Sequence, residues 1–297
     1  MVLVAVSLLT PTQVREICRV LRIQPTKTLG QNFVHDGGTV RKIVAASQVL
    51  PGEHVLEVGP GLGSLTLGLL EAGARVTAIE IDPLLATALP ATVAGHGGEA
   101  LRVLNRDAIH VTDPGCLQDL PLINGEHANW QAPTKLVANL PYNVAVPLVL
   151  SVLEHFPTIG ELLVMVQTEV AQRLCATPGG RVYGVPTVKV AWYGRATMAG
   201  SISRNVFWPV PNVDSSLVRI ERTAPREVDV RREDVFALVD AAFAQRRKTL
   251  RAALKHRAGS ASRAEEILQA AGIDPMRRGE TLSVEEFISL ARAEATV

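Results

Sequence analysis

The stretch HVLEVGPGLGSLTLGLLEAGARVTAIEID, from His54 to Asp82, decides the fold of this chain. It begins with a short apolar run typical of a buried strand, and a glycine-rich turn leads into a segment with leucines at helical spacing, which Gly73 ends. A second apolar strand (residues 75–81) follows and ends on two carboxylates, Glu80 and Asp82. A strand, turn, helix and strand in this order nearly always form a right-handed crossover. The stretch therefore predicts an α/β fold with a parallel sheet.

The glycine turn indicates a site for a cofactor that carries a nucleoside. Glycines let the backbone approach a ligand closely, a helix N-terminus offers free N–H groups, and Glu80 can accept both hydroxyls of a ribose. The dinucleotide pattern G-x-G-x-x-G is not met, since its third glycine would fall on Ser64 or Thr66. The pattern present, E-x-G-x-G-x-G at residues 57–63, resembles the first motif of methyltransferases that use S-adenosylmethionine (AdoMet). A glycine turn in an unrelated unit is the alternative.

Composition limits the class of protein. The chain of 297 residues has room for about two domains, and its hydrophobic content of 47% is enough for a full core. With a net charge of +1, any surface for nucleic acid must be local. Three widely spaced cysteines without a C-x-x-C pattern favour neither a disulfide framework nor a zinc site, so we expect no metal and a reduced cytoplasm. The apolar N-terminus lacks the features of a secretory signal and is too short to span a bilayer, so we expect no membrane association.

Residues 139–142, which directly follow a predicted strand at 135–138, indicate the chemistry. An exocyclic adenine amine is a poor nucleophile because its lone pair is delocalised into the ring. The side-chain oxygen of Asn139 and the carbonyl of Leu140 can accept hydrogen bonds from the two N–H groups of this amine. Pro141 stiffens the turn, and Tyr142 can stack on the base. No strong general base is required, since a sulfonium is the leaving group and positioning does most of the work. In isolation the same residues would be an ordinary turn.

Other elements complete the predicted sheet. Asp107, just after a strand at 101–104, can accept from an adenine amino group or, equally well, cap a helix. We expect a helix at 83–93, a strand at 161–167, and an antiparallel pair at 196–201 and 213–220 at the sheet edge. Two aromatic residues join that pair; of these, Phe207 is expected at the wall of a base pocket and Trp208 equally there or in the core.

The composition changes after residue 222, where no further strand is apparent. Residues 1–222 are therefore expected to form one domain and residues 223–297 a small all-α domain, with helices at 235–256, 261–271 and 284–293. Within the first of these helices lie six basic residues and no acid between positions 245 and 257: Arg246, Arg247, Lys248, Arg251, Lys255 and Arg257. Helical spacing would put Arg247, Arg251 and Lys255 on one face, which favours contact with an RNA backbone. A solvated basic face is the alternative.

Together the motifs resemble one family, the ribosomal RNA adenine N6,N6-dimethyltransferases, and within it the KsgA/RsmA type that acts on small-subunit (16S) rRNA. The resemblance runs from about residue 26 to 282. It rests on LGQNF (29–33), EVGPGLG (57–63), NLPYN (139–143), FWPVPNVDS (207–215) and QRRKTL (245–250). Residues 117–133 and the long N-terminus depart from the family pattern.

The resemblance implies a Rossmann-like class I AdoMet methyltransferase fold, with a seven-stranded, mostly parallel sheet and an all-α C-terminal domain. It implies transfer of two methyl groups to each of two adjacent adenosines in the 3′-terminal hairpin loop of 16S rRNA, free or in a pre-small-subunit particle, by a cytoplasmic protein that need be no more than a monomer. The cofactor-binding residues that it implies are Asn32, Val34, Gly59, Gly61, Gly63, Glu80, Ile81, Asp107, Ala108 and Asn139. The residues that it places at the target base are Asn139, Leu140, Pro141, Tyr142 and Phe207.

Several other functions are weighed against this one. A macrolide-resistance methyltransferase of large-subunit rRNA would share the fold and the chemistry, but such enzymes usually read Asn-Ile-Pro at residues 139–141. An assembly factor without activity would not need an intact set of site residues. A nicotinamide oxidoreductase does not fit the glycine spacing, and a cytosine-C5 methyltransferase would need a cysteine after a proline. A DNA adenine methyltransferase is chemically possible.

Overall fold

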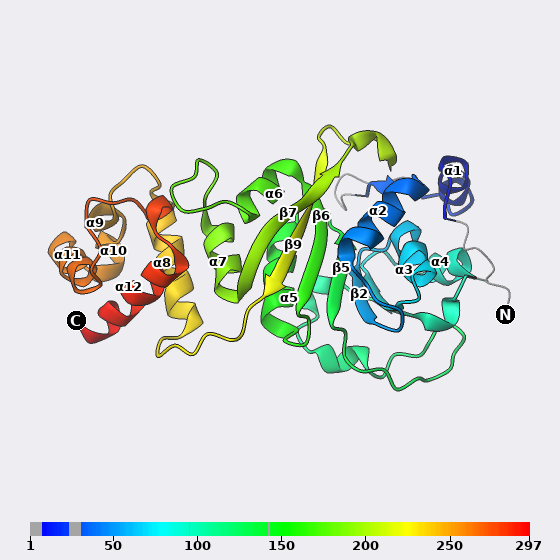
Figure 1. Cartoon of the computed structure of the whole chain (residues 1–297), viewed down its shortest axis with the longest axis horizontal. Helices are drawn as coiled ribbons and strands as arrows, with labels where there is room; N and C mark the ends of the chain where they lie inside the picture. The colour runs from blue at the N-terminus through cyan, green and yellow to red at the C-terminus, as the bar shows by residue number, and fades with distance from the viewer. Residues whose placement is uncertain (1–7, 24–30, 95, 142) are drawn as a thin grey trace. The chain divides into compact units, whose positions relative to one another are not determined.

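The computed structural model describes residues 8–23, 31–94, 96–141 and 143–297. Figure 1 shows the helices and strands in chain order. The strands are β1 (Phe33–Val34), β2 (His54–Val58), β3 (Arg75–Glu80), β4 (Leu101–Asn105), β5 (Lys135–Asn139), β6 (Glu161–Gln167), β7 (Gly194–Ile202), β8 (Phe207–Trp208) and β9 (Ser215–Arg222). The helices are α1 (Pro11–Val20), α2 (Gly37–Ser47), α3 (Ser64–Glu71), α4 (Pro83–Val93), α5 (Ala145–His155), α6 (Thr168–Leu174), α7 (Val185–Tyr193), α8 (Arg232–Ala244), α9 (Leu250–Ala253), α10 (Lys255–Ala258), α11 (Ala261–Ala270) and α12 (Val284–Thr296). Short 3₁₀ turns occupy Gly98–Ala100, Ala108–His110, Pro114–Leu117, Arg204–Val206 and Gly279–Thr281.

Seven strands form one sheet in the order β4-β3-β2-β5-β6-β9-β7. The pairs β2/β3, β2/β5, β3/β4 and β5/β6 are parallel, whereas β9 runs antiparallel to β6. The strand order reverses between β2 and β5, which is where open α/β sheets bind their ligands. Together with the all-helical C-terminal region, this arrangement confirms the predicted fold class.

Local sequence accounts for the helix boundaries near this reversal. Asp82 caps α4 by accepting from the amide of Leu84 at 2.9 Å, and Pro83 follows at the first helical position. This is the arrangement that Asp-Pro favours, because a proline there has no N–H to lose. Gly63, the N-cap residue directly before α3, has a φ of +86°, a conformation that glycine adopts without strain. The predicted bounds of α4 and β6 agree with the structure to the residue.

The outer edge of β4 is covered by the segment that follows it. Arg102 on β4 is only 1% exposed and forms an antiparallel bridge with Leu122. Its guanidinium donates to the carbonyls of Leu117, Gln118 and Ala128, and it lies over the ring of Trp130 at 4.3 Å from the centroid. Residues 117–130 are therefore fastened to the sheet by one buried arginine.

The chain divides into two compact units, Met1–Ala171 with Thr197–Arg222 and Gln172–Ala196 with Thr223–Val297. The change at residue 222 lies where the composition changes. The segment Gln172–Ala196, however, belongs to the second unit, whereas the sequence places it in the first domain. The cause is packing, because α7 contacts α8 and α12 and the hydroxyl of Tyr183 donates to the carbonyl of Leu282 at 2.7 Å.

The predicted single helix over residues 235–256 is wrong. The helix α8 ends at Ala244, and a turn leads into the short helices α9 and α10. The amides of Leu250 and Arg251 donate to the carbonyls of Arg277 (2.7 Å) and Pro275 (3.1 Å). Backbone bonds to a distant loop thus replace the bonds of a continuous helix. Arg247, Arg251 and Lys255 therefore do not share one helix face.

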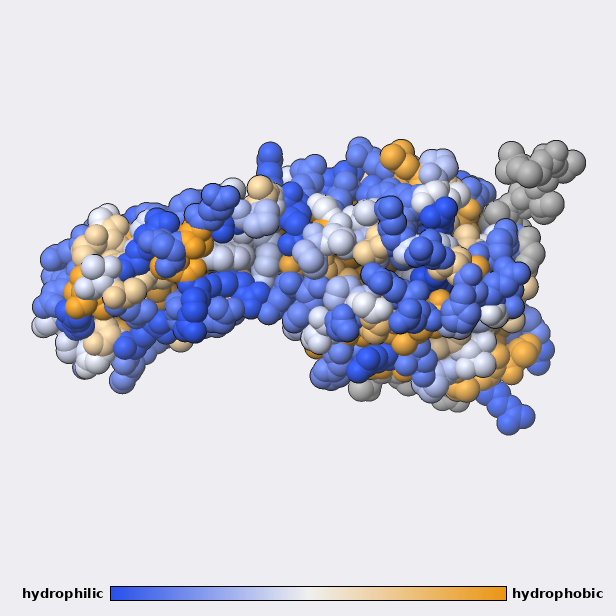
Figure 2. All heavy atoms as spheres, turned by 90° about the horizontal axis from the view of Figure 1, so that it is seen from below, coloured by the Kyte–Doolittle hydropathy of each residue, from blue (hydrophilic) through white to orange (hydrophobic). Residues whose placement is uncertain are grey.

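The face that Figure 2 draws carries hydrophobic residues in separate patches. These residues (orange) are scattered between hydrophilic ones. In the described part of the chain, no helix is long and apolar enough to cross a membrane.

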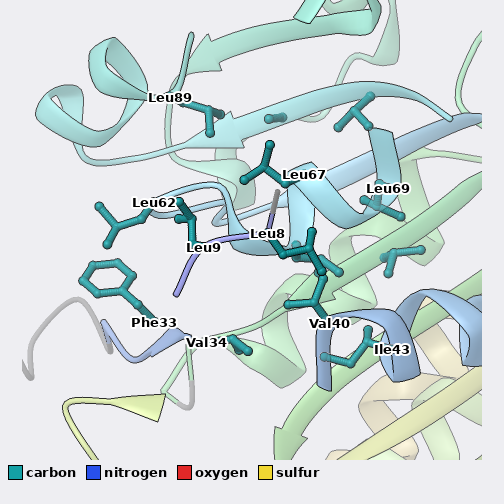
Figure 3. Close-up of a cluster of buried hydrophobic side chains, with 14 of the residues drawn as sticks. Leu8, Leu9, Phe33, Val34, Val40, Ile43, Leu62, Leu67, Leu69 and Leu89 are labelled. Atoms are coloured by element: carbon teal, nitrogen blue, oxygen red, sulfur yellow. The ribbon is translucent and has the colours of Figure 1, made fainter. Parts of the chain in front are cut away.

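A continuous hydrophobic core supports the first unit. Figure 3 shows part of it, with side chains that come from the segment before α1 and from α2, α3 and α4. These include Leu8, Leu9, Val40, Ile43, Leu67, Leu69 and Leu89. Phe33 and Val34 of β1 belong to the same cluster, so a short segment before α2 is fixed on the main body of the unit.

Candidate active site

A cavity of about 1080 Å³, the open space at its mouth included, lies at the carboxyl ends of β2, β3, β4 and β5. Most of the site residues expected from the sequence line it: Asn32, Val34, Gly59, Gly61, Glu80, Ile81, Asp107, Ala108, Asn139 and Pro141. Its lining also includes residues that the site prediction left out, among them Gln31, Phe33, Glu57, Arg106 and Asn143. Each of these adjoins a predicted residue or stands in a quoted motif, and that closeness is the signal that could have identified it.

Three expected site residues are placed differently, and a fourth lies outside the described residues. Among the described residues, Gly63, Leu140 and Phe207 do not line the cavity. Gly63 caps α3, and the buried Leu140 donates its amide to the carbonyl of Met165. Phe207 was expected at the wall of a base pocket, but its side chain is 1% exposed and lies in the core. Tyr142 lies outside the described residues, as do positions 29 and 30 of the first motif.

Residues of β2 and β5 line the cavity. These two strands pair at Val55 with Lys135 and at Leu56 with Leu136. By contrast, β2 pairs with β3 along its whole length, and β5 with β6 likewise. The cavity lies at the strand-order reversal between β2 and β5, beside Asn139.

Glu80, at the end of β3, is a buried carboxylate aimed at the cavity. It is 4% exposed, and its two oxygens accept from the amides of Gly61 (3.0 Å) and Asp82 (2.9 Å). Burial raises its pKa, while the two amides oppose this because they stabilise the ionised form. Each oxygen keeps a free lone pair, so the group can accept two further hydrogen bonds from a ligand.

Glu57, on β2, is a second buried acid in the lining. It is 1% exposed and accepts from the hydroxyl of Thr66 at 2.7 Å. Burial raises its pKa to about 8, the Thr66 hydroxyl opposes the rise, and nearby Glu80 adds to it. Glu57 therefore keeps its proton to a higher pH than an ordinary surface glutamate does.

This protonation predicts a pH dependence of stability. Between the ordinary pKa of 4.5 and the folded value of about 8, the folded protein holds a proton that the unfolded chain has lost. The free energy of unfolding therefore falls as pH rises through this window, by about 1.4 kcal/mol per pH unit at most. Glu57→Gln keeps the neutral form and removes the slope. We expect urea denaturation between pH 5 and 8 to show the variant gaining stability relative to wild type as pH rises; parallel profiles would contradict the assignment.

Residues 31–34, here called the strap, lie along the cavity. Phe33 and Val34 pair with Trp208 and Phe207 of β8 in an antiparallel ladder. The hydroxyl of Ser64, at the start of α3, donates to the carbonyl of Val34 at 2.6 Å. By composition this segment resembles a plain loop, and only the family resemblance marks it as part of the site.

The glycine turn and the strap touch at Gly61. Its φ is +57°, and a Cβ there would lie 2.9 Å from the ring of Phe33. Gly61→Ala should therefore displace the strap in addition to straining the backbone, and we expect AdoMet affinity to fall about tenfold. Gly52→Ala is the matched control, since Gly52 has a φ of +81° but nothing within 4 Å of its Cβ position. Both variants should lose about 1 kcal/mol of stability, and calorimetry should show weaker cofactor binding for Gly61→Ala alone; equal affinities would show that the contact does not matter.

Asn139, the last residue of β5, has a fixed amide orientation. Its Nδ2 donates to the carbonyl of Asn32 in the strap at 3.2 Å. Because a carbonyl can only accept, the nitrogen must face it, and Oδ1 is left as the group that can accept from a ligand. The strap thus determines which end of this amide is presented.

On the other side of the cavity, Asp107 follows β4 and caps a short 3₁₀ turn. Its Oδ1 accepts from the amide of Ile109 at 3.0 Å. Asp107 is therefore a cap, and it also lines the cavity. In the described part of the chain, no group of three or more histidine, cysteine or acidic residues is arranged to hold a metal.

The basic run 245–257 is divided by ion pairs. Arg246 pairs with Glu280 at 2.8 Å, Arg251 with Glu265 at 2.7 Å and Arg257 with Glu294 at 2.6 Å. The described residues offer no ion pair to the remaining three, which are exposed: Arg247, Lys248 and Lys255. These three cations are the ones free to meet an external anion.

Comparison with known proteins places this chain among ribosomal RNA methyltransferases. The family model for ribosomal RNA adenine dimethylase matches residues 23–293. The chain is 57% identical to the ribosomal RNA small subunit methyltransferase A of Thermobifida fusca, over 96% of this chain and 95% of that protein. It is 55% identical to the protein of the same name from Paenarthrobacter aurescens, over 98% and 95%. The solved structure of the 23S rRNA methyltransferase ErmE is 27% identical, covers 89% of this chain and all of that one, and has a TM-score of 0.64.

The match extends across both compact units and includes every residue that lines the cavity. The seven-stranded, mostly parallel sheet agrees with it. The chain therefore belongs to the ribosomal RNA adenine dimethylase family.

Proposed function

We propose that this enzyme transfers methyl groups from AdoMet to N6 of two adjacent adenosines in the 3′-terminal hairpin loop of 16S rRNA, giving N6,N6-dimethyladenosine during ribosome biogenesis. The observation that carries the proposal is the orientation of Asn139, whose amide nitrogen is held by the strap so that Oδ1 is the group presented. An adenine amine needs such an acceptor before its lone pair can attack. The names of the bacterial relatives support the small subunit as the source of the RNA, and we place the reaction in the cytoplasm.

The cavity has the chemistry that AdoMet needs. The Glu80 carboxylate can accept the two ribose hydroxyls, and Asp107 can accept from the adenine amino group. Ile81 and Ala108 offer apolar surfaces for the two faces of the base. At Gly59 and Gly61, with φ of +68° and +57°, the backbone can approach the methionine end of the cofactor closely.

AdoMet supplies an electrophilic methyl group on a sulfonium. The chain's own residues position the amine that receives it. Asn139 Oδ1 and the carbonyl of Leu140 accept hydrogen bonds from the N–H groups of N6, so that the lone pair of N6 points toward the cavity. Pro141, which lines the cavity, stiffens the turn that carries these acceptors, and we assign stacking on the base to Tyr142. Positioning of this kind can contribute several orders of magnitude to a rate.

For the RNA backbone we propose a surface in the second unit that we call the loop platform. Backbone bonds join three loops there, since Gly179 donates to Glu280 at 2.8 Å and Leu250 donates to Arg277 at 2.7 Å. The side chain of Arg246 reaches the carbonyl of Arg181 and so fastens the loops together. The exposed cations of the platform are Arg181, Arg247, Lys248 and Arg278.

The platform predicts a change in salt dependence. Arg247→Gln with Lys248→Gln should reduce the log–log slope of RNA binding against salt by about 1.4, since each phosphate contact to single-stranded RNA contributes about 0.7. Arg257→Gln, which removes a cation already paired with Glu294, should change the slope by less than about 0.3. Filter binding from 50 to 300 mM salt measures both. Equal slopes in all three proteins would place the RNA elsewhere.

The function itself is tested by transfer of tritiated methyl groups from AdoMet to unmethylated small-subunit particles, with large-subunit RNA and duplex DNA as parallel acceptors. We expect label in 16S rRNA, recovered as N6,N6-dimethyladenosine. Label in large-subunit RNA would support the activity named for ErmE instead. Binding of AdoMet without label in any acceptor would point to an assembly role, and size-exclusion chromatography of the same sample tests our assumption of a monomer.

A further inference from the structure

The strap makes a second contact at Gln31, directly before Asn32, whose carbonyl accepts from Asn139. The side chain of Gln31 donates from Nε2 to Oδ2 of Asp82 at 3.0 Å. The next residue, Asn32, accepts at its carbonyl from the amide of Asn139. Adjacent positions of the strap therefore reach opposite sides of the cavity, one to the end of β3 and one to the end of β5.

Asp82 connects this attachment to the acid expected at the ribose. Its backbone amide donates to Glu80 at 2.9 Å, and its Oδ1 caps α4. The second oxygen, Oδ2, accepts from Gln31. Asp82 itself does not line the cavity, whereas Glu80 and Gln31 do. It is thus placed to act on the site through its neighbours, without touching a ligand.

We infer that Gln31 and Asp82 form a latch that holds the strap across the cavity and thereby keeps the amide of Asn139 turned with Oδ1 toward the target base. The inference rests on the proposed function and adds two positioning residues to it. With the latch closed, the Asn32 carbonyl stays in place and the Asn139 nitrogen must face it. With the latch open, the strap loses its contact with the end of β3, while the pairing of β1 with β8 beyond Asn32 remains. The amide of Asn139 then loses its fixed orientation.

Opening the latch should affect kcat and the affinity for AdoMet differently. Opening it removes an orientation that matters in the transition state, so kcat should fall. Asp82 touches no part of the cavity, so the dissociation constant for AdoMet should change little when only its latch oxygen is removed. A general loss of folding would instead change both quantities together with thermal stability.

Three variants test this. Asp82→Ser keeps a capping oxygen for α4 but is too short to reach Gln31, and Gln31→Met keeps the length of the side chain without a donor. Asp82→Asn should keep much of the wild-type activity, because the Gln31 amide can rotate so that its oxygen accepts from the side-chain amide that the substitution introduces. The matched control is Asp113→Ser, since Asp113 also precedes a proline and accepts from the amide two residues on, that of Gly115 at 2.8 Å.

For methyl transfer to small-subunit particles, we expect Asp82→Ser and Gln31→Met each to lower kcat about tenfold, as the loss of a hydrogen bond to a charged group would. The double variant should fall no further than either single one, and Asp82→Ser should keep its AdoMet affinity within about threefold. Multiplying effects in the double variant, or an equal loss in Asp113→Ser, would overturn the latch while leaving the proposed function intact.

A second readout does not depend on the reaction. The amide of His35, the residue directly after the strap, donates to the carbonyl of Val206 at 3.0 Å, so hydrogen exchange over residues 31–35 reports on strap order. Asp82→Ser should speed exchange there severalfold, Asp113→Ser should not, and Asp82→Asn should restore protection. Unchanged exchange in Asp82→Ser would overturn the latch even if the protein proved to methylate another acceptor.

Discussion

Asn139→Ala is expected to lower kcat for methyl transfer at least about 100-fold, the usual consequence of removing one preorganised polar group from an active site. The variant loses the acceptor that Oδ1 provides, and the adenine amine then keeps its lone pair in the ring. The measurement is single-turnover transfer from AdoMet at saturating concentration, so that a change in cofactor affinity does not enter the rate.

Two controls make this result specific. Calorimetry should show AdoMet binding to Asn139→Ala weakened much less than turnover, because Glu80 and the glycine turn are intact. Asn124→Ala, in the exposed turn before Gly125, should leave both quantities unchanged. Turnover within a factor of three of wild type in Asn139→Ala would remove this residue from the mechanism.

Glu80→Gln is expected to weaken AdoMet binding at least about 100-fold. Two hydrogen bonds from ribose hydroxyls to a buried carboxylate contribute roughly 1.5–3 kcal/mol each. A glutamine has one acceptor oxygen, so its nitrogen must face either the Gly61 or the Asp82 amide, and two donors then oppose each other in a buried place. Titration calorimetry with AdoMet measures the loss.

The kinetic pattern should differ from that of Asn139→Ala. At saturating AdoMet, Glu80→Gln should recover much of the wild-type kcat, because the groups around the target amine are unchanged. Glu126→Gln, which alters an exposed glutamate, should bind AdoMet normally. An affinity within threefold of wild type for Glu80→Gln would place the ribose elsewhere in the cavity.

Local patterns in the sequence predicted the part of the fold that holds the cavity. Buried strands read as unbroken apolar runs, and the cap residue and proline at Asp82–Pro83 mark the start of α4. Because the carboxyl ends of parallel strands meet at one edge, positions as distant as Gly59, Glu80, Asp107 and Asn139 were expected together, and they line one cavity.

What the sequence did not predict depends on contacts between distant segments. The basic run looked like one helix because nothing within it breaks helical spacing; its interruption comes from backbone bonds to residues 275 and 277. Phe207 looked like part of a pocket wall, yet its partner across a short ladder is Val34, far away in the chain. The raised pKa of Glu57 likewise depends on burial from all sides, which no sequence pattern reports.

The buried Arg102 has a consequence for how copies of this protein behave toward one another. A strand at the border of a sheet exposes backbone groups that can recruit a strand from a second molecule, which is a common route to aggregation. On β4, Leu101 and Arg102 already pair with residues 122 and 123. The Arg102 guanidinium also donates to backbone carbonyls within residues 117–128 of the same segment. By holding this segment on β4, the arginine leaves fewer backbone groups of that strand open to pairing with a second copy.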